Sequence, residues 1–375
     1  MLMIQAHCYD SWLNPEARRT LLYRWSQELS TLAAPMFLFL CGVSFALVTE
    51  GLRQKNKPQS QIFKTALLRG VEILGFGLLL RVQEYVLGYP KSPWTDLLKV
   101  DVLNILGVSI IFMALFWRLV NTSGLPESST GHGGVSVKGT ESVGTWRNRL
   151  IGLSLLIAAV MAIATPPLWT THRPRFLPWM LESYINGVHN FGSPTPWIFS
   201  IFPWSGFAFV GLAFGSFLFS DFAQRKEGSA LGIVGAIGAL ACALSLWWDY
   251  SSVKIYAVYD YWHSSPNFFL MRCGILLLLT FVTFLWCRRG WATEGFSPFI
   301  QFGKTSLLVY WVHIEFVYGR LSILPKFRST IPLATTGMML IFVTMLGISI
   351  WRARAKKRAA VSLQTATTQS LSEAM

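Results

Sequence analysis

Charge is scarce in this chain of 375 residues: only 13% of them are Asp, Glu, Lys or Arg, whereas soluble domains carry about 25%. Hydrophobic residues make up 53% of the sequence, and the mean hydropathy is +0.45. The deficit of charge excludes an ordinary soluble domain and predicts a membrane protein. The net charge of +14 is then explained by basic loops between apolar segments, so we expect no nucleic-acid partner.

Cysteine pairs with the spacing of metal ligands are also lacking. The five cysteines are scattered, at Cys8, Cys41, Cys242, Cys273 and Cys287. Without a CxxC arrangement, neither a zinc site nor a disulfide framework is expected, so we predict no metal. The N-terminus has no basic segment and no small-residue cleavage site, which argues against a cleaved signal peptide.

Long apolar runs are abundant, and a spanning helix needs about 20 such residues. Nine candidates are residues 30–49, 62–88, 98–120, 149–167, 196–220, 229–248, 267–287, 297–319 and 331–351. Residues 1–7 form a tenth run that is too short to span. We therefore predict an all-α integral membrane bundle of about ten transmembrane segments whose first segment is truncated. About 15 further apolar residues are expected upstream in the genome.

A polar stretch divides these segments. Residues 121–145 are rich in Gly, Ser and Thr and predict a flexible linker between segments 1–4 (residues 1–120) and segments 5–10 (residues 146–352). The basic residues 353–375 are expected to form a disordered tail. The even-numbered connections and this tail hold 18 Lys and Arg residues against 11 in the odd-numbered connections. This bias predicts that the linker and the C-terminus are cytoplasmic.

Ionisable side chains inside apolar runs are costly, so they indicate functional sites. His7 ends the first run, and Asp10 follows three residues later on the same helical face. We expect His7 to act as a general base, with Asp10 orienting its ring. A histidine that only binds lipid headgroups is the alternative.

Asp101 and Asn104 open the segment 98–120 and share one helical face. They are expected to hold a substrate hydroxyl or a histidine, although Asp101 would equally suit a helix cap. In the preceding segment Arg81 and Glu84 are three residues apart, and we expect them to pair with each other.

Segment 297–319 contains the string FGKTSLLVYWVHIEF. Tyr310 and His313 share a face of the expected helix and are predicted to line the substrate site. Lys304 points roughly to the opposite face, near the cytoplasmic end. It would either bind a phosphate of coenzyme A or extend its side chain to the membrane surface.

Two outer connections, residues 166–198 and 249–266, interleave aromatic side chains with carboxylates, amides and histidines. A belt of aromatic residues at the membrane interface would have this composition. A lid over an outward-facing site is the other interpretation, because aromatic faces flanked by polar groups suit sugar rings.

Five strings spread over nearly the whole chain are LMIQAH, PMFLFLCGVSFAL, DVLNILG, FPWSGFAFVGLAFG and GKTSLLVYWVH. Their order resembles the heparan-alpha-glucosaminide N-acetyltransferase family of membrane acetyltransferases and its bacterial relatives. The resemblance implies acetyl transfer from acetyl-CoA to an amino sugar or glycan across the membrane, with His7 at the position of the active-site histidine. It also implies residence in a bacterial inner membrane. The family also has an asparagine and an Asp/Arg-Gly stretch ahead of that histidine; residues 1–6 do not contain them, and we expect them upstream of Met1. Acyltransferase-3 membrane enzymes look similar in outline.

A transporter or flippase for a polar or glycolipid substrate is the alternative function, because charges inside the membrane suit it equally. A transporter of this kind is expected to contain two duplicated halves, and the sequence shows no such internal repeat. The identity of the acceptor, a covalent or direct route for the acetyl group, and a homo-oligomeric state stay open at this point.

The distribution of basic residues generates a prediction about topology. A Ser129→Cys variant should stay unlabelled by a membrane-impermeant thiol reagent in intact cells and become labelled once the membrane is permeabilised, relative to the parent protein. Labelling of that cysteine in intact cells would place the linker outside.

Overall fold

The computed structural model describes residues 1–122, 143–187, 199–251, 255, 256, 258, 260, 261, 264–290 and 295–373. These residues form helices and no strand; one isolated bridge joins Leu13 and Ser329. The predicted all-α class is therefore confirmed. The chain divides into two compact units. Unit 1 contains Met1–Ala33, Val86–Lys91 and Arg289–Met375, and unit 2 contains Ala34–Tyr85 and Ser92–Arg288.

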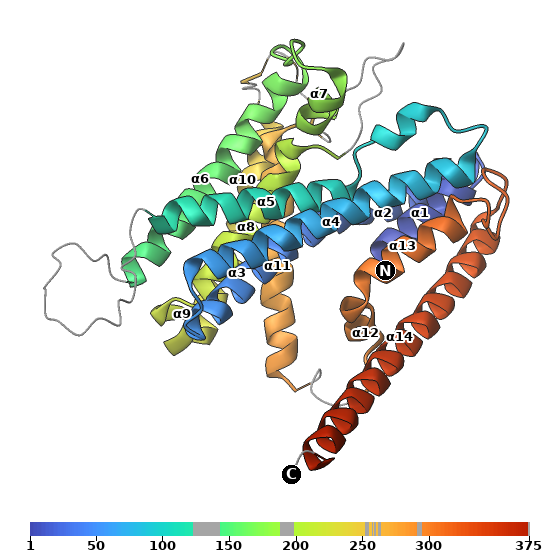
Figure 1. Cartoon of the computed structure of the whole chain (residues 1–375). Coiled ribbons are helices and arrows are strands. Elements are labelled where there is room, and N and C mark those ends of the chain that lie inside the picture. Colours follow the sequence, from blue (N-terminus) through green and yellow to red (C-terminus); the bar gives the residue numbers. More distant parts are fainter. Residues whose placement is uncertain are drawn as a thin grey trace, which may run out of the picture. The chain divides into compact units, whose positions relative to one another are not determined.

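Unit 2 holds most of the apolar helices. They are α3 (Ala33–Gln54), α4 (Gln59–Gly88), η2 (Trp94–Leu98), α5 (Val102–Thr122), α6 (Val143–Trp169), α7 (Trp179–Asn186), α8 (Ile201–Leu218), α9 (Asp221–Arg225), α10 (Glu227–Tyr250) and α11 (Pro266–Arg288). Helix α8 packs against α5 and α6, and α10 packs against α11 (Figure 1). Because α8 is buried along nearly all of its length, it forms the centre of this unit.

Glycines allow α3 and α8 to approach closely. A Cβ atom added at Gly42 would lie 1.9 Å from the carbonyl oxygen of Ala208, and one added at Gly211 would lie 1.9 Å from that of Phe39. Neither position has room for any side chain. This close approach follows the small-residue packing of membrane helices.

Unit 1 is built on both ends of the chain. Its helices are α1 (Leu2–Trp12), η1 (Ala17–Arg19), α2 (Leu21–Ser30), α12 (Pro298–Lys304), α13 (Ser306–Val317) and α14 (Ile331–Glu373). Helix α1 packs against α13 and α14. Trp12, Leu13, Val317, Ala334 and Met345 are completely buried in the core that these helices share. This packing brings residues about 300 positions apart in the sequence into contact.

Seven helical segments among the described residues are long and apolar enough to cross a membrane. They are Leu21–Gln54, Trp94–Thr122, Val143–Trp169, Ile201–Leu218, Glu227–Tyr250, Pro266–Arg288 and Ile331–Lys356. The chain is therefore an integral membrane protein with an α-helical bundle, while the count of ten segments stays a prediction.

Two expected spans differ from the prediction for physical reasons. The span 62–88 becomes α4, a helix of 30 residues whose many charged side chains exclude it from the apolar set. The span 297–319 is not one helix, because the backbone leaves the helical region at Thr305, with φ −127° and ψ 24°. Helices α12 and α13 result, and α13 has only 12 residues.

The structure describes the predicted C-terminal tail but only the ends of the predicted linker. Residues 123–142, most of the linker, lie outside the described residues. Helix α14 continues to Glu373, so residues 353–373 have helical backbone where the sequence predicted disorder. The string RARAKKRAA consists of strong helix formers, and extending an existing helix costs no new nucleation.

The contact between α3 and α8 generates a stability prediction. Gly42→Ala should lower the free energy of unfolding by about 1–3 kcal/mol, because the added methyl group overlaps a backbone carbonyl that cannot rotate away. Gly51→Ala on the same helix meets nothing within 4 Å and serves as the matched control. Thermal unfolding in detergent measures both variants, and equal stability of the two would refute the close contact.

Candidate functional site

Two histidines from opposite ends of the chain meet in unit 1. The Nδ1 atom of His7, on α1, lies 3.0 Å from the Nε2 atom of His313, on α13. Their rings are nearly parallel, with centroids 5.2 Å apart and planes inclined by 7°. His313 is only 1% exposed, whereas His7 is half-buried, so His7 is the member of the pair that a substrate can reach.

The hydrogen bonds of this pair fix which nitrogen carries each hydrogen. His313 Nδ1 lies 2.8 Å from the backbone carbonyl oxygen of Val309. A carbonyl can only accept, so His313 must carry its hydrogen on Nδ1. Burial among apolar side chains favours the neutral ring, and Nε2 of His313 then accepts a hydrogen bond from Nδ1 of His7. A neutral His7 therefore presents its lone pair on Nε2, which has no hydrogen-bond partner among the described residues.

Two tyrosines enclose the histidine pair. The ring of Tyr318 meets the His7 ring edge-on, with centroids 5.3 Å apart, and Tyr310 meets His313 in the same way at 5.8 Å. Tyr318 donates a hydrogen bond of 2.9 Å to the carboxylate of Asp10. Burial raises the pKa of Tyr318 far above its usual value, with the nearby Asp10 carboxylate adding to the effect, so the phenol keeps its hydrogen and donates it.

Asp10 acts on this arrangement indirectly. Besides accepting from Tyr318, its carboxylate lies 3.7 Å from the Arg18 guanidinium, which also donates to the Asp10 backbone carbonyl. The expectation that Asp10 orients the His7 ring directly is corrected: His313 bonds the ring, and Asp10 holds the tyrosine that packs against it. The spacing of three residues indicated a shared helical face, but His313 of α13 bonds the Nδ1 atom of His7.

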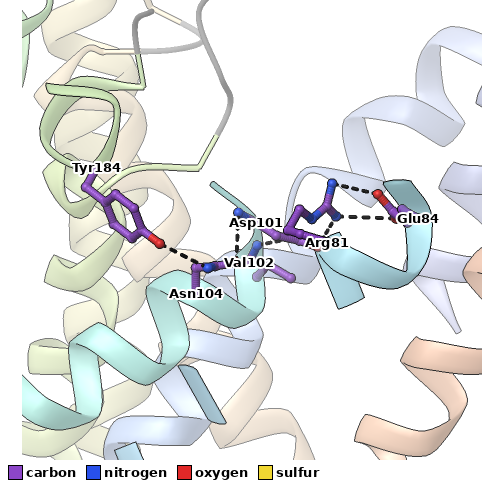
Figure 2. A network of polar contacts seen from close by, with 6 residues as sticks. All are labelled: Arg81, Glu84, Asp101, Val102, Asn104 and Tyr184. Carbon is purple, nitrogen blue, oxygen red and sulfur yellow. Dashed lines mark hydrogen bonds and ion pairs between the residues drawn. The ribbon is translucent and has the colours of Figure 1, made fainter. Parts of the chain in front are cut away.

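Unit 2 holds a second polar cluster, around the start of α5 (Figure 2). The Asn104 side chain accepts a hydrogen bond of 3.3 Å from the backbone N–H of Asp101 and donates one of 3.0 Å to the Tyr184 hydroxyl. Asp101 directly precedes α5, as expected of a helix cap, and its carboxylate also accepts from the backbone N–H of Val102. Both Asp101 and Asn104 are buried.

Arg81 joins this cluster from α4. Its guanidinium lies 2.7 Å from the Glu84 carboxylate, which confirms the predicted pair, and 2.6 Å from the Asp101 carboxylate. The second ion pair joins α4 to the start of α5 and was not predicted, because residues 20 positions apart have no fixed spatial relation in the sequence (Figure 2). Asp101 is therefore neutralised by arginine.

Helix α7, which carries Tyr184, is held by a buried carboxylate. Glu182 is completely buried, and its carboxylate accepts a hydrogen bond of 2.8 Å from Arg173 and one of 3.0 Å from Asn186. Asn186 also donates to the backbone carbonyl of Leu168. Burial alone would raise the pKa of Glu182, but these two donors, together with the positive charges of Arg173 and Arg175, hold the pKa below its usual value. The expected aromatic residues at 188–198 lie outside the described residues.

Lys304, expected to bind the donor, is the last residue of α12 and is exposed. The break at Thr305 removes the continuous helix on which its opposite orientation to His313 was based. Among the described residues, no group of three His, Cys, Asp or Glu side chains is arranged to hold a metal ion, and the expectation of no metal stays a prediction.

Several contributors to these sites were not anticipated from the sequence. They are the Val309 carbonyl, Tyr318, Arg18 and Glu182. The carbonyl and Arg18 carry no distinguishing pattern. Tyr318 follows the last residue of α13, so helical periodicity from His313 does not extend to it. The packing of α1 against α13 reveals the roles of Val309 and Tyr318, while Arg18 acts from η1 and Glu182 from α7.

Comparison with known families identifies one match. The family described as "Heparan-alpha-glucosaminide N-acetyltransferase, catalytic" matches residues 1–130. The matched part contains His7, Asp10, Asp101 and Asn104, whereas His313 lies beyond it. The match confirms the predicted resemblance over this part of the chain and indicates a membrane acetyltransferase in general terms. No curated protein matches the chain.

The carboxylate of Glu182 generates a pH-dependent prediction. Arg173→Met should lower the free energy of unfolding near pH 7 by roughly 2 kcal/mol, because a buried acceptor loses a charged donor. A folded-state pKa below the unfolded one stabilises the protein above the unfolded pKa, and this stability is lost as the pH falls through the folded pKa. The difference between wild type and variant should therefore persist from pH 7 down to about 4.3, the ordinary pKa of a glutamate, and shrink as the pH falls below it in thermal unfolding experiments.

Arg225→Met is the control, because Arg225 is an exposed arginine at the end of α9 in the same unit. A destabilisation of the same size in both variants, or one that is independent of pH, would contradict the role assigned to the Arg173–Glu182 pair.

Proposed function

We propose that this protein transfers an acetyl group from acetyl-CoA to the amino group of an amino sugar or glycan across the membrane, with His7 as general base. The family match over residues 1–130 supports acetyl transfer. The observation that carries the residue assignment is the hydrogen-bond chain from His7 through His313 to the Val309 carbonyl.

This chain of hydrogen bonds prepares His7 for proton transfer. Because the Val309 carbonyl determines the hydrogen on His313, and His313 determines the hydrogen on His7, the basic lone pair of His7 is restricted to Nε2. In a serine protease a buried carboxylate holds the catalytic histidine in the correct tautomer. Here a second, neutral histidine and a backbone carbonyl supply the same restriction without a buried charge.

The proposed step begins with a neutral amine of the acceptor. Its nitrogen attacks the acetyl carbonyl carbon while an N–H proton passes to His7 Nε2. The bond between the carbonyl carbon and sulfur then breaks, and the departing sulfur takes that proton, which returns His7 to its neutral form. The same Nε2 lone pair would attack the thioester in a covalent route, so both routes use one atom.

The remaining site residues have supporting roles in this proposal. Tyr310 and Tyr318 restrict the histidine rings by packing, and Asp10 positions Tyr318. Asp101 and Asn104 are proposed to contribute to acceptor binding through their network with Tyr184. We further propose a bacterial inner membrane as the location, with the C-terminus in the cytoplasm, because most basic connections lie on that side.

Substitution of the histidines tests the function. His7→Ala should lower kcat/KM for acetyl transfer by about 10²–10⁴-fold, which is the usual loss of a general base. His313→Ala should lower it less, because His7 remains but its tautomer is no longer fixed. The double variant should be no slower than His7→Ala, since residues that act as one unit are not additive. Radiolabelled acetyl-CoA with a panel of amino sugars provides the measurement.

His132→Ala serves as the control, because His132 belongs to the Gly-, Ser- and Thr-rich stretch 121–145 of the sequence. The control should retain wild-type activity. If His7→Ala kept near wild-type transferase activity while remaining folded, His7 would be an interfacial residue and the proposed mechanism would be wrong.

A further inference from the structure

Helix α1 carries His7 and ends at Trp12, less than two helical turns later. The carbonyls of its last turn have no partner within the helix and need donors from elsewhere. Backbone N–H groups satisfy three of them: those of Leu13, Phe327 and Ser329 donate to the carbonyls of Tyr9, Ser11 and Trp12 in that order. The carbonyl of Asp10 instead accepts from a side chain, the guanidinium of Arg18. An arginine therefore completes the end of the helix that carries His7.

Arg18 makes further contacts around the end of α1. Its Nε atom donates a hydrogen bond of 3.1 Å to the carbonyl of Leu13, the residue after the helix. The guanidinium also lies 3.7 Å from the Asp10 carboxylate, and its central carbon lies 5.8 Å from the centroid of the Tyr23 ring on α2. A planar group with five N–H donors can serve several acceptors at once, and its positive charge suits the negative end of a helix dipole.

The connection between α13 and α14 is strained where it meets Arg18. Phe327 has a φ of 57°, a left-handed backbone conformation that bulky residues rarely adopt. Such a conformation persists only where the surrounding structure imposes it. The guanidinium carbon of Arg18 lies 4.8 Å from the centroid of the Phe327 ring, and the Phe327 N–H bonds the Ser11 carbonyl on α1. Arg18 thus holds the end of α1 and this connection together.

Both segments that Arg18 holds also reach the histidine pair. Asp10 lies three residues after His7 on α1, and its carboxylate accepts the hydrogen bond from the Tyr318 hydroxyl. Tyr318 begins the connection after α13, and its ring packs edge-on against the His7 ring. Loss of the Arg18 contacts would therefore release the helical turn of His7 and the aromatic ring beside it at the same time.

We infer that Arg18 is a positioning residue for the general base: by holding the end of α1, Asp10 and Phe327, it keeps His7 Nε2 in the orientation that accepts the proton. The inference rests on the proposed function, because it concerns His7 during acetyl transfer. The ion pair with Asp10 contributes little by itself, since both partners are partly exposed. The hydrogen bonds to two carbonyls need the rigid fork of an arginine, and alignment matters because a displacement of about 1 Å can lower a rate about 10²-fold.

Steady-state kinetics of the purified full-length protein test the inference. Arg18→Met removes the donors but keeps a long side chain, and it should lower kcat for acetyl transfer about 10- to 100-fold while the KM for acetyl-CoA changes by less than about twofold. Arg19→Met is the matched control, because the neighbouring Arg19 is exposed on the same short helix, and it should retain the wild-type kcat. Arg18→Lys keeps the charge but loses the fork, so it should show a smaller loss of kcat and replaces Arg18→Met if that variant does not fold.

A second background separates positioning from support of the fold. In His7→Ala the general base is absent, so adding Arg18→Met should cause no further loss of kcat, because residues that act as one unit are not additive. The rates are compared for the folded fraction collected by size-exclusion chromatography. A loss of equal size in both backgrounds would show that Arg18 only supports the fold and would overturn the inference. A wild-type kcat in folded Arg18→Met would overturn it as well.

Chemical modification provides a measurement that does not require activity. Diethyl pyrocarbonate modifies neutral imidazole rings that it can reach, and mass spectrometry counts the modified peptides. His313, only 1% exposed, should stay protected in wild type and in Arg19→Met but become modified in folded Arg18→Met as the histidine pair separates. Equal protection of His313 in all these proteins would contradict the inference. If protection depends on Arg18 but wild type transfers acetyl to no acceptor, the proposed function fails while the positioning of the pair by Arg18 stands.

Discussion

A polar group placed among apolar helices has to find its partner inside the protein, and this constraint governs the site of this chain. His313 is almost completely buried and satisfies both ring nitrogens, one with the Val309 carbonyl and one with His7. The backbone carbonyl is the decisive member, because it can only accept. The Val309 carbonyl fixes the tautomer of His313, and His313 in turn fixes the tautomer of His7. A backbone group of an ordinary helix residue therefore determines which nitrogen of His7 carries the lone pair.

The use of a neutral partner has an electrostatic consequence. A carboxylate buried beside His7 would have to be desolvated, whereas a neutral imidazole carries no such cost. In the proposed mechanism His7 accepts a proton, and the positive charge then develops on the more exposed ring of the pair. The carboxylate that is present, Asp10, is half-exposed, is paired with Arg18, and acts through the Tyr318 hydroxyl. The charged groups thus stay at the margin of the apolar core, and the proton-accepting atom stays accessible.

The same constraint shapes unit 2 in a different way. Charges inside this unit are neutralised by ion pairs: Arg81 bridges Glu84 and Asp101, and Arg173 bonds the buried Glu182. These pairs join α4 to α5 and fix α7, so that Asn104 and Tyr184 meet with defined geometry (Figure 2). Ion pairs of this kind stabilise one arrangement of helices because separating the partners would leave a charge in an apolar environment.

Composition and periodicity along single helices were enough to predict the membrane class, the α-helical architecture, most apolar helices and the candidates His7, Asn104 and His313. The resemblance over the first part of the chain was likewise readable from short strings. The bond between His7 and His313, the ion pair between Arg81 and Asp101, and the break of the helix at Thr305 became visible in the folded protein. Contacts between residues 20 to 306 positions apart depend on how helices pack, and periodicity within one helix carries no information about its neighbour.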